Sequence, residues 1–325
     1  MRLGVHLERW EAIAPFRIAG RTWTEFESVV VELGIDGLVG RGEAMGVFYL
    51  GETPARIRDQ IVEVAPRIQS GMDKATLQAI LPPGGARNAV DCAFWDLECK
   101  RQRRRIWEIA GITPKVVETV YTIGIESTPE AMARKAAAAT DHAILKVKLD
   151  AQNPLARLLA VRASRPDARI VVDANQSWSL RELKELAPRF ADLGVEMIEQ
   201  PLPRGEDHDL ALYRSPVPLC ADESCLTLDE LDIAATRYQL INIKLDKTGG
   251  LTHALSLARA ARDRGLGLMV GNMCGSSLAL APAVVIACLA DLADVDGPLL
   301  QRWDRLPGLE YASGRVAPFG AALWG

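Results

Sequence analysis

Three acidic residues in the second half of the chain each follow a short apolar run. They are Asp173, Glu199 and Asp222, and they are separated by 26 and 23 residues. One carboxylate after such a run is usually a helix N-cap or a turn residue, but three that converge would repel one another unless a cation lay between them. Hard oxygen donors without His or Cys favour magnesium, which keeps positions open for substrate oxygens. The pattern therefore predicts one Mg²⁺ per active site, held by these carboxylates.

Three lysines lie at matching positions. Lys146 and Lys148 point to the same face of a predicted strand in "ILKVKLD" (144–150), and Lys244 follows Asp222 by 22 residues. On a solvated edge strand such a pair would only guard the edge. A lysine acts as a base when its pKa falls from about 10.4 toward neutrality, and a neighbouring ammonium and a dication both lower it. We therefore expect Lys148 and Lys244 to face each other as bases, with Lys146 lowering the pKa of Lys148.

The elements that must position these side chains alternate regularly from about residue 117 onward. Short β-branched runs are separated by stretches whose apolar residues recur every three or four positions, as in amphipathic helices. Eight strands alternating with seven helices predict a parallel sheet closed into a barrel, whose active site lies at the C-terminal strand ends. Lys247, past Asp246 and beside "TGG", is predicted to lie in the loop after the sixth strand. The predicted strands are 117–124, 143–149, 169–175, 195–201, 217–224, 240–247, 265–272 and 292–298.

The first 115 residues have a different pattern. Two β-rich runs flank "GIDG" within residues 21–44, which predicts a hairpin, and helical patterns follow. Strands followed by helices without alternation indicate a separate α+β domain. We therefore expect an α+β domain at residues 1–115 and a barrel domain at 116–304. The Gly- and Ala-rich tail, 305–325, is expected to pack back on the first domain.

The composition is that of a globular protein of one large or two ordinary domains. Its 325 residues are 49% hydrophobic and 25% charged, and 38 basic against 42 acidic residues give a formal net charge of −4. The chain contains no run of basic residues, so we expect no nucleic-acid partner. Its longest apolar run is too short to cross a membrane. Glu8 and Glu11 interrupt the place of a signal-peptide core, and six cysteines without C-x-x-C spacing argue against a zinc site or disulfide scaffold. We expect a cytoplasmic protein.

The ordered motifs resemble those of the enolase superfamily, and within it the muconate-lactonising subgroup. The resemblance implies a (β/α)7β modified TIM barrel with an N-terminal α+β capping domain, and a lysine base beside magnesium. Asn175 and Glu223, which adjoin the metal ligands, are expected to support them. The residues that carry the resemblance are "GRGEA" (40–44), "KVK" (146–148), "DAN" (173–175), "EQP" (199–201), "ADES" (221–224) and "NIKLDKTGG" (242–250).

Within that subgroup the chain looks most like the dipeptide epimerases, in particular the L-Ala-D/L-Glu epimerases of peptidoglycan recycling. "DVD" resembles the D-x-D motif with which those enzymes hold the α-ammonium group of a dipeptide, so Asp294 and Asp296 are candidate substrate ligands. Arg21 matches a capping-loop arginine that reads the glutamate side chain. Asp294 as a turn residue and Arg21 as a solvated residue are the alternatives. The chain departs from many relatives in carrying "CGSS" (274–277) where they have a Glu, which leaves the N-terminal residue of the dipeptide open.

The resemblance predicts a 1,1-proton transfer on a small dipeptide. The metal and Lys146 would stabilise an enediolate while Lys148 and Lys244 exchange the α-proton on opposite faces. An N-acylamino-acid racemase or an o-succinylbenzoate synthase would share the metal and the lysines but would not need Asp294 and Asp296. A Schiff-base barrel without metal and a non-catalytic carboxylate-binding protein are alternatives of other classes. The sequence is also compatible with a homo-oligomer.

Overall fold

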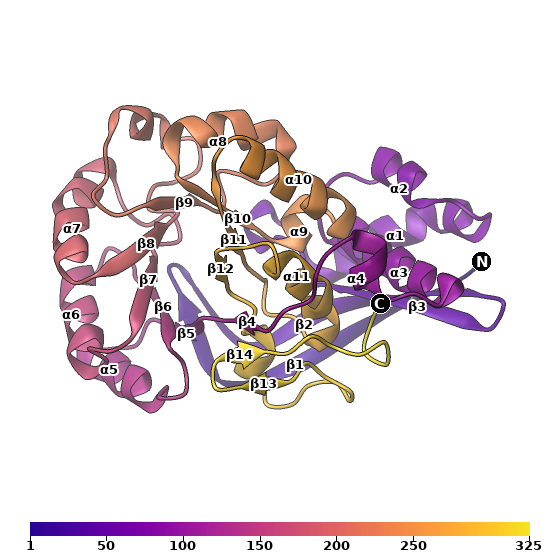
Figure 1. Cartoon of the computed structure of the whole chain (residues 1–325), viewed down its shortest axis with the longest axis horizontal. Helices are drawn as coiled ribbons and strands as arrows, with labels where there is room; N and C mark the ends of the chain where they lie inside the picture. Colours follow the sequence, from indigo (N-terminus) through magenta and orange to yellow (C-terminus); the bar gives the residue numbers. More distant parts are fainter.

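The computed structural model describes all 325 residues, which form an N-terminal antiparallel sheet with helices and a larger barrel (Figure 1). The second and third strands join at Asp36 and Gly37, whose φ angles of 50° and 79° are both positive, as the favoured two-residue hairpin requires. The hairpin predicted around "GIDG" is therefore confirmed. The sheet consists of β1 (Arg2–Ile18), β2 (Arg21–Ile35) and β3 (Leu38–Ala44).

Helix α3 lies against β3 at very short range because β3 carries two glycines. A Cβ atom at Gly42 would lie 2.1 Å from the carbonyl oxygen of Ala89, and one at Gly40 would lie 2.3 Å from that of Ala93. Only a residue without a side chain fits such an approach. The helices of this part are α1 (Pro54–Gln69), α2 (Lys74–Ile80), α3 (Gly85–Gln102) and α4 (Ile106–Ala110), with a short 3₁₀ helix, η1 (Phe48–Leu50).

The opposite side of α3 is bonded to the barrel. The buried Arg87 donates from Nη2 to the carbonyl oxygen of Thr248 at 2.7 Å and from Nε to that of Gly249 at 3.3 Å. One turn later, the buried Asp91 accepts the backbone N–H of Thr252 at 3.0 Å. Two charged side chains of the N-terminal part are therefore satisfied by backbone groups of the barrel.

The barrel is a parallel sheet whose eight strands follow one another in chain order from β5 to β12. This confirms the predicted fold class. Its strands are β5 (Tyr121–Ile123), β6 (Ile144–Lys148), β7 (Arg169–Asp173), β8 (Val195–Glu199), β9 (Leu219–Ala221), β10 (Leu240–Ile243), β11 (Gly267–Val270) and β12 (Leu292–Ala293). Its helices are α5 (Pro129–Ala138), α6 (Pro154–Ser164), α7 (Leu180–Asp192), α8 (Leu231–Arg237), α9 (Leu245–Thr248), α10 (Leu251–Asp263) and α11 (Ser277–Ala287).

One crossover differs from the predicted alternation. Between β8 and β9 the chain forms only a 3₁₀ helix, η2 (His208–Leu212), where an α-helix was expected. The physical reason is proline, which lacks a backbone N–H and interrupts helices. Residues 200–218 include four prolines, at positions 201, 203, 216 and 218.

Two layers of side chains fill the lower barrel. Successive residues of a strand alternate in direction, so residues two positions apart share the interior face. The lower layer is apolar, and the first and last strands meet there through a hydrogen bond from the N–H of Val120 to the carbonyl oxygen of Ala293 at 2.9 Å. Its members are Val120, Ile144, Val171, Met197, Cys220, Leu240, Met269 and Leu292. Two residues farther along each strand lies a largely polar layer, made of Thr122, Lys146, Asp173, Glu199, Asp222, Asn242, Gly271 and Asp294.

The C-terminal tail returns to the N-terminal part. The indole N–H of the fully buried Trp324 donates to the carbonyl oxygens of Arg41 at 2.9 Å and Cys92 at 3.2 Å. On the way, β13 (Tyr311–Ala312) and β14 (Arg315–Val316) form a small sheet with β4 (Val117–Glu118). The exact domain boundaries stay a prediction. None of the helices is both long enough and apolar enough to cross a membrane.

The close approach of α3 and β3 makes a prediction about stability. Gly42→Ala should lower the free energy of unfolding by about 1–3 kcal/mol, because the new Cβ atom must displace the α3 backbone. The measurement is chemical denaturation. Gly320→Ala is the matched control, since a Cβ atom there meets nothing within 4 Å. Equal stability of the two variants would contradict the predicted steric cause.

Candidate active site

Lys146 lies at the centre of the polar layer. Its buried ammonium group is 2.7 Å from both Glu199 Oε2 and Asp294 Oδ2, and 3.1 Å from Asp173 Oδ2. Burial lowers its pKa, but the three carboxylates outweigh burial and hold the pKa well above its ordinary value. Lys146 is therefore a permanent positive charge. Three carboxylates balance the charge of Lys146. The structure therefore does not support the prediction that Lys146 acts mainly by repelling the ammonium group of Lys148.

Asp173 and Glu199 end two adjacent strands and lie side by side in register. Lys148 Nζ is 2.5 Å from Asp173 Oδ2. Burial alone would raise the pKa of Asp173, but Lys148 and Lys146 together lower it to about 2. The pKa of Glu199 is raised instead, by burial and by the neighbouring Asp173. Asp173 is thus the firmly ionised member of this pair.

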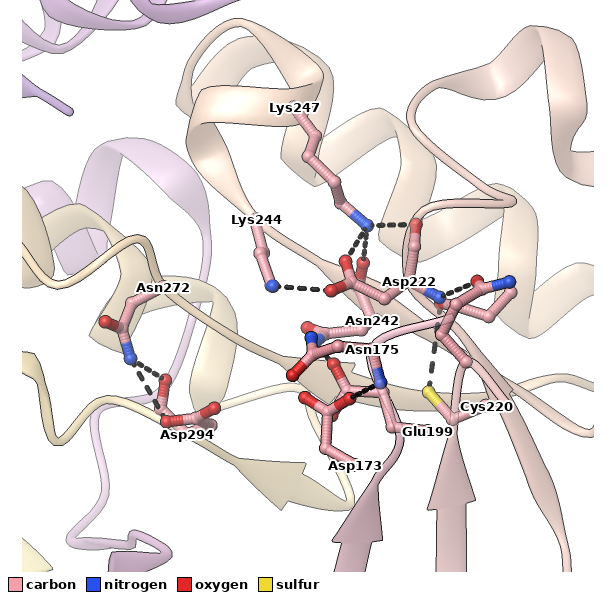
Figure 2. Close-up of polar contacts among 12 residues, drawn as sticks. Asp173, Asn175, Glu199, Cys220, Asp222, Asn242, Lys244, Lys247, Asn272 and Asp294 are labelled. Carbon is pink, nitrogen blue, oxygen red and sulfur yellow. Dashed lines mark hydrogen bonds and ion pairs between the residues drawn. The ribbon is translucent and has the colours of Figure 1, made fainter. Parts of the chain in front are cut away.

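Asp222, on the next strand end, binds two lysines (Figure 2). Lys244 Nζ lies 2.6 Å from Oδ2 and Lys247 Nζ lies 2.8 Å from Oδ1. Burial would raise the pKa of Asp222, but the two ammonium groups hold it far below its ordinary value. The pKa of Lys244 is raised, because Asp222 outweighs the lowering effect of burial. The lowered pKa expected for a base is therefore absent at Lys244 in the protein alone.

Lys247 does not lie in a loop, which corrects the sequence-based prediction. It belongs to the short helix α9 and is almost fully buried. Besides Asp222 Oδ1, its ammonium group donates to three backbone carbonyl oxygens: Asn242 at 2.6 Å, Asp222 at 2.7 Å and Cys225 at 3.0 Å. Lys247 therefore fixes the end of β9 to the end of β10.

Asparagine and glycine complete the layer around the carboxylates. Asn242 donates from Nδ2 to Glu199 Oε1 at 2.7 Å. A Cβ atom at Gly271 would lie 2.7 Å from the Asn242 amide and 2.9 Å from Lys244 Cε, so Gly271 leaves room for both side chains. Asn175 donates its backbone N–H to Asp173 Oδ1 at 2.9 Å. The buried atoms Asn175 Oδ1, Asn242 Oδ1 and Glu223 Oε2 have no hydrogen-bond partner.

The composition of this cluster fits a divalent cation. Six buried carboxyl groups face only four lysines, an imbalance equal to the charge of one dication. Burial and neighbouring carboxylates raise the pKa of Glu223 to about 8, so that it keeps a proton that a cation would replace. The unpartnered oxygens are hard donors of the kind magnesium prefers. Asp173, Glu199 and Asp222 each contact a lysine, and no three acidic side chains are arranged as a metal site. The six are Asp173, Glu199, Asp222, Glu223, Asp294 and Asp296.

A second pair of carboxylates follows the last strand. Besides its contact with Lys146, Asp294 accepts the Asn272 side-chain N–H at its carbonyl oxygen (2.7 Å) and at Oδ1 (3.1 Å), as Figure 2 shows. The carboxylate of Asp296 accepts the backbone N–H of Thr122, at 2.7 Å, and contacts no lysine or arginine. Burial and the nearby Asp294 raise the pKa of Asp296 to about 8. Asp296 is therefore the carboxyl group of the pair that lacks a cation.

A cavity of about 320 Å³ joins these groups. Lys148 and Lys244 line it from β6 and from the end of β10, with β7, β8 and β9 between them along the sheet. Asp294 and Asp296 line another part of the wall. The N-terminal part closes the mouth with Arg21, whose guanidinium lies 4.8 Å from the Trp23 ring centroid and 4.7 Å from that of Phe48. The structure thus brings all the predicted site residues to one cavity or its immediate wall.

Three further residues of the site were not among the predicted ones. Asn242 could have been found, because it lies two positions before Lys244 and therefore on the same face of the strand. Lys247 could not, since its burial depends on the short helix that follows β10. Asn272 lies in the loop after β11, where no periodicity indicates the direction of a side chain.

A capping sheet over a barrel whose strand ends carry lysines and carboxylates is the architecture of the enolase-type barrel enzymes. Comparison with known families agrees. The N-terminal domain of mandelate racemase and muconate lactonizing enzyme matches residues 3–111, and the enolase C-terminal domain-like family matches residues 130–316. The chain belongs to the mandelate racemase / muconate lactonizing enzyme family of the enolase superfamily.

Two curated relatives are similar over most of their length. The L-Ala-D/L-Glu epimerase of Escherichia coli K12 is 43% identical over 312 residues, which cover 95% of this chain and 97% of the relative. An N-acetyl-D-glutamate racemase from Pseudoalteromonas is 46% identical over 254 residues, or 78% of this chain and 80% of the relative.

Solved structures show the same similarity. An enolase family member from Agrobacterium tumefaciens with homology to dipeptide epimerases, with bound sodium and L-Ala-L-Glu, superposes with a TM-score of 0.97 at 41% identity, covering 99% of both chains. The dipeptide epimerase of Enterococcus faecalis complexed with Mg and L-Leu-L-Tyr has a TM-score of 0.89 at 26% identity, over 97% of this chain and 96% of that one.

The buried contacts of Lys247 make it a structural residue. Lys247→Met should lower the free energy of unfolding by about 3–5 kcal/mol, because it removes the buried ammonium group that donates to Asp222 Oδ1 and to three carbonyl oxygens. Urea denaturation measures the change. Lys184→Met, on the exposed face of α7, is the control. A loss no larger than that of the control would show that Lys247 is dispensable for stability.

The raised pKa of Asp296 predicts a pH dependence. Its ordinary value is 3.8 and its value in the folded protein is about 8. Between these pH values the folded state keeps a proton that the unfolded state has released, so this contribution to stability is lost as the pH rises toward 8. Asp296→Asn removes it. The stability of wild type relative to the variant should therefore fall from about pH 5 to about pH 8 and then level off; a constant difference would refute the assignment.

Proposed function

We propose that this protein is a dipeptide epimerase that inverts the C-terminal residue of L-Ala-D/L-Glu or a closely similar dipeptide. The observation that carries the proposal is the placement of Lys148 and Lys244 on opposite sides of one cavity, beside a carboxylate cluster. Inversion requires one group to remove the α-proton and another to return a proton to the opposite face. The similarity to the Escherichia coli epimerase over 95% of the chain supports the same reaction.

Lys148 and Lys244 act as the base and the acid of the proposed reaction. In one direction Lys148 takes the α-proton and Lys244 donates one, and in the other direction the roles are exchanged. Each must be neutral when it acts as the base, so the contacts with Asp173 and Asp222 must weaken when substrate binds. Lys146, always charged, stabilises the negative charge that develops on the substrate carboxylate.

Asp173, Glu199 and Asp222 are the residues that would hold Mg²⁺. When bound, the ion supplies positive charge beside the substrate carboxylate. The same carboxylates would then be shared between the ion and the lysines. The attraction of Asp173 for the Lys148 ammonium group and of Asp222 for that of Lys244 would become weaker. Asn175 and Glu223 would support this ligand set through their unpartnered oxygens.

The ammonium group of the dipeptide would lie near the second carboxylate pair, Asp294 and Asp296. A dipeptide places its ammonium roughly 6–7 Å from its carboxylate, and Asp296 lines the cavity without a cationic partner. A charge-assisted contact there contributes about 1.5–3 kcal/mol. Asp294 takes part mainly by holding Lys146. Arg21, at the cavity mouth, is positioned to bind an acidic side chain.

Racemisation of N-acetylglutamate is the second candidate. It is favoured by the 46% identity to the Pseudoalteromonas racemase. Both substrates are inverted at the α-carbon of a glutamate, so the lysines and carboxylates would serve either one. The two differ at the nitrogen, because only the dipeptide carries an ammonium group that calls for the unpaired carboxylate of Asp296.

Deuterium incorporation separates the candidates and tests the lysine roles. With Mg²⁺ in D₂O, wild type should exchange the glutamate α-proton of L-Ala-L-Glu with a higher kcat/KM than that of N-acetyl-L-glutamate. Lys148→Ala and Lys244→Ala should each abolish epimerisation but still exchange the proton of one epimer, through the remaining lysine. Mass spectrometry of both epimers is the measurement.

Metal removal is the control for this experiment, and two outcomes would contradict the proposed reaction. EDTA should stop all exchange, and added Mg²⁺ should restore it. A higher kcat/KM for N-acetylglutamate would replace the dipeptide assignment by the racemase. Exchange of both epimers at similar rates by either lysine variant would contradict the two-base reaction.

A further inference from the structure

A buried ion pair joins three separate parts of the chain beside the cavity. Glu43, in the "GRGEA" motif at the end of β3, is almost fully buried. Its Oε2 accepts Arg305 Nη2 at 2.9 Å and Nε at 3.2 Å. Its Oε1 accepts the backbone N–H of Ser276 at 3.1 Å, and the Ser276 hydroxyl donates to Oε2. This carboxylate therefore binds both the C-terminal tail and the loop after β11.

Arg305 completes the junction from the tail. Its Nε donates to Ser276 Oγ at 2.7 Å, Nη2 also donates to Glu8 on β1, and its guanidinium lies 5.1 Å from the centroid of the Trp10 ring. The planar fork of an arginine suits three such partners, whereas a lysine ammonium offers a single centre. The side chain is only 17% exposed, so its contacts are largely shielded from water.

The loop that is held at Ser276 also contacts Asp294, one of the two carboxylates proposed to bind the substrate ammonium group. Asn272 Oδ1 accepts the backbone N–H of Cys274 at 2.7 Å, and Gln301 Nε2 donates to the Cys274 carbonyl oxygen at 3.0 Å. From the same side chain, Asn272 Nδ2 donates to the carbonyl oxygen and carboxylate of Asp294. Asn272 and Cys274 both line the cavity. The loop from 271 to 276 is thus fixed at one end by the ion pair and at the other by Asp294.

We propose that Glu43 and Arg305 are positioning residues for the N-terminal half of the substrate. They hold the loop from 271 to 276 so that Asn272 orients Asp294, which in turn places the neighbouring carboxylate of Asp296 toward the cavity. The inference rests on the proposed function, because it assigns these carboxylates to a dipeptide ammonium group. It gives a role to "GRGEA", to "CGSS" and to the start of the tail, none of which touches the lysines.

The first test is kinetic. Arg305→Lys keeps the charge but loses the fork, and it should raise KM for L-Ala-L-Glu about 10-fold while kcat changes less than about 3-fold. Glu43→Gln, which leaves Arg305 paired with Glu8, should do the same and serves if the first variant is unstable. Arg302→Lys is the control, because Arg302 lies in the same segment but pairs with Glu11 at the surface.

A double-mutant cycle shows whether the effect passes through Asp294. In an Asp294→Asn background, Arg305→Lys should add less than about 2-fold to KM, since the carboxylate it positions is already absent. Amide hydrogen exchange should become faster at Ser276 and Cys274 in Arg305→Lys but not in Arg302→Lys. A full 10-fold effect in both backgrounds, or a fall in kcat with unchanged KM, would overturn the inference.

Failure of the inference is distinct from failure of the proposed function. If wild type does not epimerise dipeptides, the function itself is wrong. If wild type is active and Arg305→Lys matches Arg302→Lys in KM, kcat and hydrogen exchange, only the positioning role is refuted.

Discussion

Buried charge is the constraint on which this active site depends. Six carboxyl groups and four lysines are enclosed at the strand ends. Asp173, Glu199, Asp222 and Asp294 each lie within about 3 Å of a lysine, while Glu223 and Asp296 have no cation and have pKa values raised to about 8. Lys146 illustrates the balance, since its three carboxylate partners come from the ends of β7 and β8 and from the residue after β12. The barrel has to close before these partners can meet, so the fold and the site are established together.

The N-terminal part contributes more than a cover. It places aromatic rings and Arg21 over the cavity mouth, and it delivers Glu43 to the loop after β11. The lysines and carboxylates at the strand ends all belong to the barrel, while the rest of the cavity wall comes from both parts of the chain. The wall that the N-terminal part contributes can therefore be altered without a change in the charged layer of the barrel.

The parts of the site that could be predicted follow a strict geometric rule. Lys146, Asp173, Glu199 and Asp222 each lie two residues beyond an apolar residue of the lower layer, so strand alternation alone directs them inward. The pairing of particular charges could not be predicted, because Lys247 reaches Asp222 only through the turn of α9. The crossover from β8 to β9 departs from the helix-after-strand pattern because four prolines interrupt it. The link from Glu43 to Ser276 joins residues 233 positions apart and leaves no local pattern.

The contacts of Arg87 and Asp91 with the barrel bear on how a substrate enters. Swinging the whole N-terminal part away would strip two buried charged groups of their backbone partners at once, at a cost of several kcal/mol. The tip of the β1–β2 hairpin is held without buried charges: the carbonyl oxygen of Arg17 accepts the backbone N–H of Ile125 at 2.8 Å, and the turn itself consists of the half-buried Ala19 and the exposed Gly20. A substrate therefore has to reach the cavity while the two halves of the molecule stay docked, through the rim that the cavity shares with the N-terminal sheet.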